Sequence, residues 1–312
     1  MSPADLYGVN TPLVTPHGAG FRPDLGALIE LLDFAAEGGV RGVCVGGTTG
    51  EFVHFSLEDR CRAIEAAARH NRVPVIAGVG HTTLEGALNL AVAAVGAGAG
   101  ALLIMPPYFF RYSQEDLYEF LLRFADGAPP GVPLLLYNIP AFTNDLAGDT
   151  LDELLSSGRF AGIKDSSGSW DLFVRLQALR AHHPFVVLMG DDKLYAKART
   201  HGADGVVSGC AGVLPELLVG MENSILAGDA RRAQALDRRL REFVVWIERF
   251  PVPLGIKLAL AERGLPAGLE SAPLGSTTRR LADQFRGWFR EWCPVVVKEA
   301  AEAVLELDER RA

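Results

Sequence analysis

Short apolar runs recur along the chain at a nearly even step, and this repeat is the feature that most limits how the chain can fold. Most of the runs are hydrophobic at every position instead of alternating with polar residues. Continuous runs of this kind are typical of strands that are buried on both faces of a parallel sheet. The runs are Val9–Val14, Gly42–Val45, Pro74–Val79, Ala101–Met105, Pro133–Tyr137, Phe160–Lys164, Phe185–Met189 and Gly205–Ser208.

The segments between these runs carry helix start signals. Ser56 with Asp59 and Ser113 with Asp116 match the capping-box spacing, and Thr82 or Thr83 is placed to cap a helix near Leu84–Val95. Eight strand–helix units predict an α/β fold of the (β/α)8 TIM-barrel type over residues 1–228. A doubly wound open sheet is the alternative, because periodicity alone does not separate the two.

The last part of the chain, residues 229–312, contains no strand-like run. Its pattern predicts three or four further helices, including Arg231–Phe250 and Thr277–Trp292. We therefore expect a C-terminal helical region packed on the barrel.

The charge balance limits the classes of partner. The chain has 30 Lys and Arg residues against 38 Asp and Glu residues, which gives a net charge of −8. A sequence-independent nucleic-acid binder needs a positive surface, so we predict no nucleic-acid partner. The arginines between positions 231 and 241 alternate with acidic residues and are interpreted as a solvated helix face.

Cysteine spacing and the N-terminal sequence bear on the cellular location. The four cysteines lie far apart, which fits neither a zinc site nor a disulfide scaffold. The N-terminus lacks a basic and apolar leader, and the uncharged stretch 87–110 is interrupted by glycines and prolines. We expect a soluble, cytoplasmic protein with no membrane partner.

In a (β/α)8 enzyme the chemistry lies at the carboxyl ends of the strands, and there Lys164 is the most informative residue. Strand alternation predicts that Lys164 points into the barrel and Ile163 points outward. A buried ammonium is costly unless it is paired or neutral, and a neutral lysine is a nucleophile that condenses with ketones. An ion pair with Asp165 or Asp191 is an equally plausible interpretation. The other four lysines fall in predicted helices, where a charged face is unremarkable: Lys193, Lys197, Lys257 and Lys298.

Two other strand ends carry groups suited to chemistry. The loop Gly46–Glu51, with the sequence GGTTGE, presents backbone N–H groups and the hydroxyls of Thr48 and Thr49, which suit a carboxylate or a phosphate. It matches neither the P-loop nor the dinucleotide fingerprint, and a tight glycine turn is the alternative. Tyr137 ends the fifth run, where its phenol can exchange a proton with a substrate oxygen, or simply be a half-buried structural tyrosine.

Four motifs in order and in register resemble the dihydrodipicolinate synthase / N-acetylneuraminate lyase family of class I, pyruvate-dependent aldolases. They are GGTTGE at 46–51, PPY at 106–108, YNIP at 137–140 and GIKD at 162–165, and the resemblance extends from about Tyr7 to Trp292.

The resemblance implies a role for particular residues. Lys164 would form the Schiff base with pyruvate, Thr48 and Thr49 would bind the pyruvate carboxylate, and Tyr137 would relay protons. The outer part of the pocket would be lined by Ser208, Gly190 and Asp191. The resemblance also implies a homotetramer or homodimer that needs neither a metal nor an organic cofactor.

Two departures from the family pattern bear on the substrate. Phe109 stands where dihydrodipicolinate synthases usually carry a second tyrosine, and Phe142 stands where they carry an arginine that binds a carboxylate. Phenylalanine cannot form the bidentate bond that arginine makes to a carboxylate. The leading hypothesis is therefore an aldolase or lyase that cleaves a 2-keto-3-deoxy sugar acid, or a related 2-oxo acid, to pyruvate and an aldehyde, with Phe142 in the aldehyde pocket. The alternatives are a divergent dihydrodipicolinate synthase and a keto-acid-binding barrel without turnover.

Overall fold

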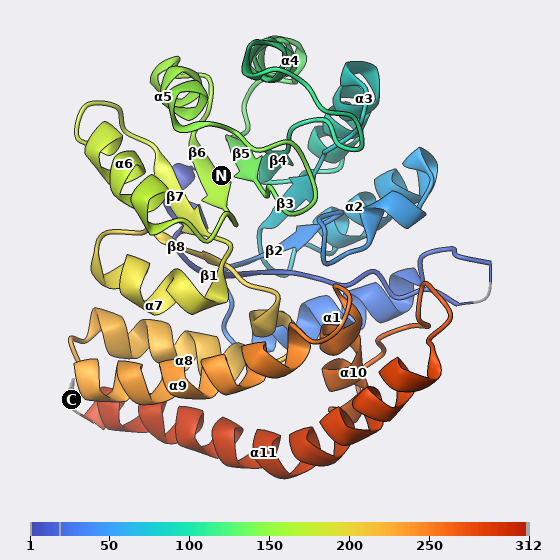
Figure 1. Cartoon of the computed structure of the whole chain (residues 1–312), viewed down its shortest axis with the longest axis vertical. Coiled ribbons are helices and arrows are strands. Elements are labelled where there is room, and N and C mark those ends of the chain that lie inside the picture. Colours follow the sequence, from blue (N-terminus) through green and yellow to red (C-terminus); the bar gives the residue numbers. More distant parts are fainter. Residues whose placement is uncertain (1, 19, 310–312) are drawn as a thin grey trace.

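A computed structural model describes residues 2–18 and 20–309 and shows a closed parallel barrel (Figure 1). Each strand pairs with the next one along the chain, and β8 pairs with β1 to close the sheet. The (β/α)8 prediction is confirmed, and the open-sheet alternative is wrong. The strands are β1 (Gly8–Pro12), β2 (Gly42–Val45), β3 (Val75–Gly78), β4 (Ala101–Ile104), β5 (Leu134–Asn138), β6 (Gly162–Asp165), β7 (Val186–Met189) and β8 (Gly205–Val207).

A helix follows each strand, and the eight helices surround the barrel. Two of the predicted N-caps form as expected: the Ser56 side chain accepts a hydrogen bond from the Asp59 amide, and Ser113 forms the full capping box with Asp116. Thr83 caps the next helix after α2. The helices are α1 (Leu25–Glu37), α2 (Leu57–His70), α3 (Leu84–Gly96), α4 (Gln114–Gly127), α5 (Gly148–Ser156), α6 (Trp170–Arg180), α7 (Asp192–Thr200) and α8 (Pro215–Leu226).

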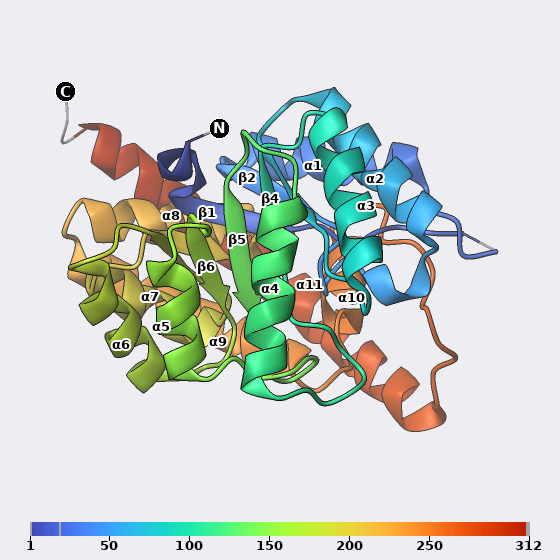
Figure 2. The same ribbon diagram turned by 90° about the horizontal axis from the view of Figure 1, so that it is seen from above.

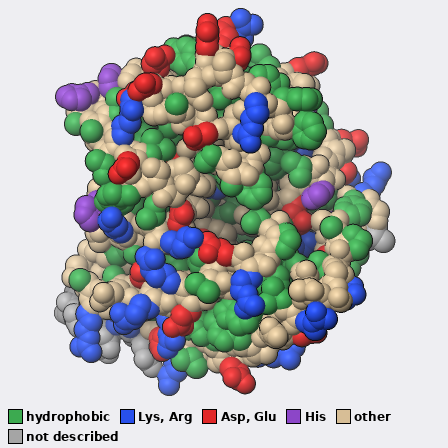
Figure 3. Space-filling view, viewed as in Figure 1, with side chains coloured by type: hydrophobic (Ala, Val, Ile, Leu, Met, Phe, Trp, Pro, Cys, Tyr) green, Lys and Arg blue, Asp and Glu red, His purple; other side chains and the backbone are tan. Residues whose placement is uncertain are grey.

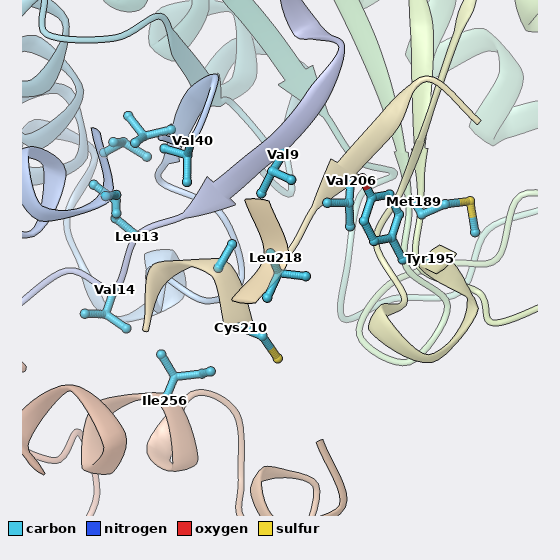
Figure 4. Packing of buried hydrophobic residues seen from close by; sticks show 14 of the residues in the cluster. Val9, Leu13, Val14, Val40, Met189, Tyr195, Val206, Cys210, Leu218 and Ile256 are labelled. Atoms are coloured by element: carbon cyan, nitrogen blue, oxygen red, sulfur yellow. The ribbon is translucent and has the colours of Figure 1, made fainter. Parts of the chain in front are cut away.

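Side-chain alternation along the strands divides the buried residues into two groups. One group fills the barrel interior and includes Tyr137 and Leu188, and the other lies between the strands and the helices and includes Ile163. Figure 4 shows part of the outer group, where Val9 and Val206 lie toward Leu218 of α8. Because Ile163 belongs to the outer group, the prediction that it points outward from β6 is confirmed.

A short 3-10 helix, Pro3–Leu6, begins the chain and supplies the Leu6 side chain to the barrel interior. Leu6 is fully buried, and its carbonyl accepts a hydrogen bond from the Asn10 side chain at 2.8 Å. Figure 2 shows this segment beside the barrel near β1 and the N-terminus. Leu6 therefore belongs to the same interior core of the barrel as Tyr137 and Leu188.

Three helices follow the barrel: α9 (Ala230–Ile247), α10 (Leu254–Glu262) and α11 (Ser276–Glu309). Helix α9 lies along α8, and α11 packs against α8 and α10, so these helices cover one side of the barrel (Figure 1). The predicted end of the last helix at Trp292 is wrong, because α11 continues through Pro294. Each helix in the described part of the chain is too short or too polar to cross a bilayer.

The buried position of Leu6 predicts a large effect on stability. We expect Leu6→Ala to lower the free energy of unfolding by about 2–5 kcal/mol, because it leaves a cavity in the interior core. Leu226→Ala, at an exposed site on α8, should change it by less than about 0.5 kcal/mol. Urea denaturation of both variants checks this, and equal effects would show that Leu6 does not support the barrel.

Candidate active site

Lys164 lies inside the barrel at the carboxyl end of β6, with 5% of its surface exposed. It is paired in register with Tyr137 of β5, and its Nζ lies 4.0 Å from the centre of the Tyr137 ring. Within residues 2–18 and 20–309, Lys164 forms no ion pair and the Tyr137 hydroxyl forms no hydrogen bond. An amine and a phenol thus lie side by side with neither of them engaged by a polar partner from the chain.

The alternative interpretation, an ion pair between Lys164 and Asp165, is wrong. Asp165 points to the other side of β6, where its Oδ1 accepts a hydrogen bond from Asn138 Nδ2 at 2.9 Å and its Oδ2 accepts one from Ser167 Oγ at 2.8 Å. Burial raises the pKa of Asp165, and these hydrogen bonds oppose the rise. Asp165 therefore joins the ends of β5 and β6 and leaves Lys164 free.

The surroundings of Lys164 are tight and largely uncharged. Burial raises the pKa of the Cys44 thiol to about 11, so Cys44 is neutral at pH 7 although Lys164 opposes the shift. A Cβ atom at Gly190 would overlap the Ser166 hydroxyl and lie 3.0 Å from Lys164 Cε. Gly190 is therefore the residue that leaves room for the lysine side chain.

The two adjacent acids after β7, Asp191 and Asp192, have different functions. Asp191 caps α7, since its Oδ1 accepts hydrogen bonds from the amides of Lys193 and Leu194. Asp192 was not among the predicted site residues, yet its Oδ2 accepts a hydrogen bond from Cys210 Sγ at 3.2 Å, and it interacts electrostatically with Lys164. Burial raises the pKa of Asp192. The sequence shows two adjacent acids but gives no sign of which one turns toward the barrel.

Ser208 follows β8 directly and is a fully buried residue at the same rim. Its hydroxyl accepts a hydrogen bond from the Ala211 amide at 3.2 Å and also lies beside the Asp192 carboxyl group. The structure thus brings Ser208, Gly190 and Lys164 together. A role for Ser208, Gly190 or Asp191 in binding substrate stays a prediction.

The loop Gly46–Glu51 begins with Gly46 at a φ of 79°, a backbone conformation that glycine adopts without strain. The Thr48 and Thr49 side chains are half-buried, and in the described part of the chain neither hydroxyl has a hydrogen-bond partner. The methyl and hydroxyl groups of Thr49 lie near Gly209, beyond the end of β8. Two free hydroxyls therefore face the rim that also carries Lys164.

The end of this loop is fixed by Lys257, one of the four lysines that fall in predicted helices, where a charged face was considered unremarkable. Lys257 of α10 is 4% exposed, and its Nζ lies 3.1 Å from Glu51 Oε2. It also donates to the Leu269 carbonyl, while Ser271 donates to the other Glu51 oxygen and contacts His17. The expectation of an ordinary exposed charge at Lys257 is therefore wrong. A buried pair ties α10 to the loop that carries Thr48 and Thr49.

A cavity of about 170 Å³ opens beside Thr48, and Phe142 lines it. Phe142 is 54% exposed, so part of its ring forms the cavity wall and part faces solvent. Figure 3 shows a hollow near the middle of the face viewed in Figure 1, with hydrophobic side chains around it. Phe109, in contrast, is 86% exposed with a φ of 80°, and its ring contacts that of Phe110.

Within the described residues, no group of three or more His, Cys, Asp and Glu side chains is arranged to hold a metal ion. His17 is buried against Phe21 and Ser271. The His81 ring forms a hydrogen bond with the Thr83 hydroxyl at the start of α3.

The chain is similar to known proteins over most of its length. A sequence model of the dihydrodipicolinate synthetase family matches residues 5–289. A 4-hydroxy-tetrahydrodipicolinate synthase of Methanothrix thermoacetophila is 34% identical over 270 residues, which cover 86% of this chain and 90% of the relative. An uncharacterized DapA-like lyase of Halobacterium salinarum is 34% identical over 287 residues, which cover 91% of this chain and 92% of the relative.

Solved structures show the same architecture. YagE, a prophage protein of Escherichia coli K12 solved in complex with pyruvate, matches this chain with a TM-score of 0.84 at 26% identity. The match covers 92% of this chain and 98% of YagE.

The buried Lys257–Glu51 pair predicts a stability effect that an exposed pair lacks. We expect Lys257→Met to lower the free energy of unfolding by about 3–5 kcal/mol, because it leaves the Glu51 carboxylate buried without its cation. Lys193→Met, which breaks an exposed pair with Glu248, should cost less than about 1 kcal/mol.

Chemical denaturation of the two lysine variants measures the difference. A Glu51→Gln/Lys257→Met double variant should lose less than the sum of its single changes, since neither charge is then left alone. Equal losses for Lys257→Met and Lys193→Met would contradict the assigned role of Lys257.

Proposed function

The chain belongs to the dihydrodipicolinate synthetase family, whose members are lyases that act through a lysine Schiff base, and we propose that Lys164 is that lysine. The observation that carries the proposal is the position of Lys164, which is buried, without an ion pair in the described residues, and in register with Tyr137. A lysine desolvated in this way is suited to nucleophilic attack on a ketone.

The reaction that we propose begins with a 4-hydroxy-2-oxo acid. Lys164 Nζ attacks the C2 carbonyl carbon, and loss of water gives a protonated imine. Thr48 and Thr49 hold the substrate carboxylate with hydroxyls that have no partner within the described chain. Fixing the carboxylate orients the reacting carbons, which removes much of the entropic barrier.

Bond cleavage follows from the imine. During imine formation the Tyr137 phenol gives its proton to the hydroxyl group that leaves as water. The resulting phenolate accepts the proton of the C4 hydroxyl, the C3–C4 bond breaks, and the electron pair of that bond moves to the imine to form an enamine. An aldehyde leaves from C4. Protonation of the enamine at C3 and addition of water then release pyruvate and restore the Lys164 amine. These steps use side chains and water alone, so the proposal includes no metal and no organic cofactor.

The substrate that we propose is a 2-keto-3-deoxy sugar acid or a related 2-oxo acid. Support comes from Phe142, which lines the cavity beside Thr48 and cannot pair with a second carboxylate. The second candidate is a divergent 4-hydroxy-tetrahydrodipicolinate synthase, which is favoured by the name of the Methanothrix relative. Product formation from pyruvate and aspartate semialdehyde would distinguish it. A barrel that binds pyruvate without turnover would form no covalent adduct.

Borohydride reduction in the presence of pyruvate tests the role of Lys164. We expect intact-mass and peptide mass spectrometry to find one reduced pyruvate on the peptide that contains Lys164. Lys164→Ala should form no adduct and lose more than about 10³-fold in turnover, while Lys197→Ala, at an exposed position on α7, should behave as the parent protein does. An adduct on another lysine, or none on the folded protein, would overturn the assignment.

The close approach of Gly190 to Lys164 gives a second test. We expect Gly190→Ala to reduce kcat by roughly 10²-fold, because the added methyl group displaces the Ser166 hydroxyl and shifts the lysine side chain by a few tenths of an ångström. Gly287→Ala, where a Cβ atom meets nothing within 4 Å, is the matched control. Steady-state rates that match for both variants would show that the space left by Gly190 is not used to position Lys164.

A further inference from the structure

We infer that the aldehyde partner of pyruvate carries an apolar group about the size of one six-membered ring, in place of a second carboxylate or a chain of hydroxyls. The inference rests on the proposed function and concerns the cavity of about 170 Å³ beside Thr48, which we call the acceptor cavity. Its chemistry favours the related 2-oxo acid over the 2-keto-3-deoxy sugar acid among the substrates proposed above, because the aldehyde released from a sugar acid is a polyol.

The wall of the acceptor cavity is mainly hydrophobic. Its apolar members come from four segments of the chain that are distant in sequence. They are Phe52, Val53, Met105, Tyr108, Phe142 and Val252.

The cavity wall is part of the core that contains Tyr137. Phe52 and Met105 belong to the same interior core as Tyr137, and Tyr108 packs against that core. An apolar protein cavity of about 150 Å³ is large enough to bind benzene, so a ring-sized group fits this space. The group bonded to the aldehyde carbon would therefore enter an apolar site that shares Thr48 with the proposed pyruvate site and shares its core with Tyr137.

Two of the polar side chains of the cavity are already engaged by other residues. The Glu51 carboxylate is bonded to Lys257 and Ser271, and the Thr143 hydroxyl donates to the Ile139 carbonyl at 3.1 Å. Thr48 is assigned to pyruvate. The polar groups left for an acceptor are the Tyr108 hydroxyl and the His54 ring. The several hydroxyls of a sugar would thus lose water and gain fewer partners than they lose, which disfavours a polyol.

No lysine or arginine lines the cavity within the described residues. Three cations contact lining residues without lining the cavity themselves. Arg111 donates to the Thr143 carbonyl at 3.1 Å, Lys257 bonds to the Glu51 carboxylate, and the Arg60 guanidinium lies over the Phe52 ring. The His54 ring is exposed at the rim and has no hydrogen-bond partner among the described residues. It can bond to one polar atom at the outer edge of the acceptor, but it lacks the two-pronged geometry by which arginine selects a carboxylate.

The two loops that face each other across the cavity are fixed before substrate arrives. The buried Asn144 side chain donates to the carbonyls of Pro107 and Phe110 at 2.7 and 2.8 Å, and it accepts from the Tyr112 amide at 3.1 Å. These bonds join the loop of Tyr108 to the loop of Phe142. A preformed apolar site loses little ordering entropy on binding, so the cavity shape selects the acceptor.

In the direction of synthesis the inferred reaction is an aldol addition. The enamine C3 of the Lys164-bound pyruvate bonds to the carbonyl carbon of the aldehyde, and the enamine electron pair forms that bond as the imine returns. The aldehyde oxygen takes the Tyr137 proton and becomes the C4 hydroxyl. Water then hydrolyses the imine and releases a 4-hydroxy-2-oxo acid with the apolar group on C4.

Matched aldehydes test the inference. Benzaldehyde, 4-carboxybenzaldehyde and glyceraldehyde are each incubated with pyruvate and the full-length protein, and the 4-hydroxy-2-oxo acid is quantified by mass spectrometry. We expect kcat/KM for benzaldehyde to exceed that for each of the other two by at least about tenfold, since one adds a carboxylate to the same ring and the other is a polyol. Higher kcat/KM for 4-carboxybenzaldehyde or glyceraldehyde would overturn the inference.

Two arginine variants show whether the acceptor cavity is responsible. Phe142→Arg should shift the ratio of kcat/KM values toward 4-carboxybenzaldehyde by tenfold or more, because it places a guanidinium at the cavity wall. Phe110→Arg changes an exposed ring that does not line the cavity and should leave the ratio unchanged. An unchanged ratio in Phe142→Arg would place acceptor recognition elsewhere and overturn the inference.

Borohydride trapping on the same preparation separates the two proposals. A pyruvate adduct on Lys164 without turnover of benzaldehyde would overturn the acceptor inference and leave the proposed function intact. Absence of the adduct would overturn both proposals.

Discussion

Hydrogen bonding between the first and last strands is the constraint on which the rest of the structure depends. Because β8 pairs with β1 and all eight strands run in the same direction, every strand ends at one rim. Residues from distant parts of the chain meet there without any local sequence relation: Thr48 after β2, Lys164 on β6 and Ser208 after β8. An open sheet of the same strands would separate the first and last members of this group by the full width of the sheet.

The sequence was sufficient to predict eight strand–helix units in a parallel sheet and the direction of the central lysine, but it did not separate a closed barrel from an open sheet. Both follow from properties that are local in the chain: continuous apolar runs indicate strands covered on both faces, and alternation sets which residues of β6 face inward. Ile163 does lie in the outer core, and Lys164 lies across from Tyr137. Cys44 and Asp192, which interact with Lys164, both have raised pKa values. Burial causes these shifts, and it arises only once the barrel is closed.

Other features depend on contacts between distant segments, and sequence patterns did not reveal them. Lys257 lies on a helix that could present any face to solvent, and only the packing of α10 against the Gly46–Glu51 loop buries it. Asp191 and Asp192 are chemically equivalent neighbours, and the start of α7 decides which one caps the helix. Proline normally favours a helix end, yet α11 continues through Pro294, where it lies along α8 and α10.

The bond between Glu51 and Lys257 joins residues that are 206 positions apart, and this separation has a consequence for the order in which the protein is made. During synthesis the Gly46–Glu51 loop leaves the ribosome long before α10 and Ser271 do. Until those residues emerge, the Glu51 carboxylate has neither of its side-chain partners. The barrel can begin to assemble as its strands appear, but the loop that carries Thr48 and Thr49 reaches its final conformation only when the C-terminal region is in place. A nascent or C-terminally truncated chain that already includes Lys164 therefore lacks the finished site around that lysine.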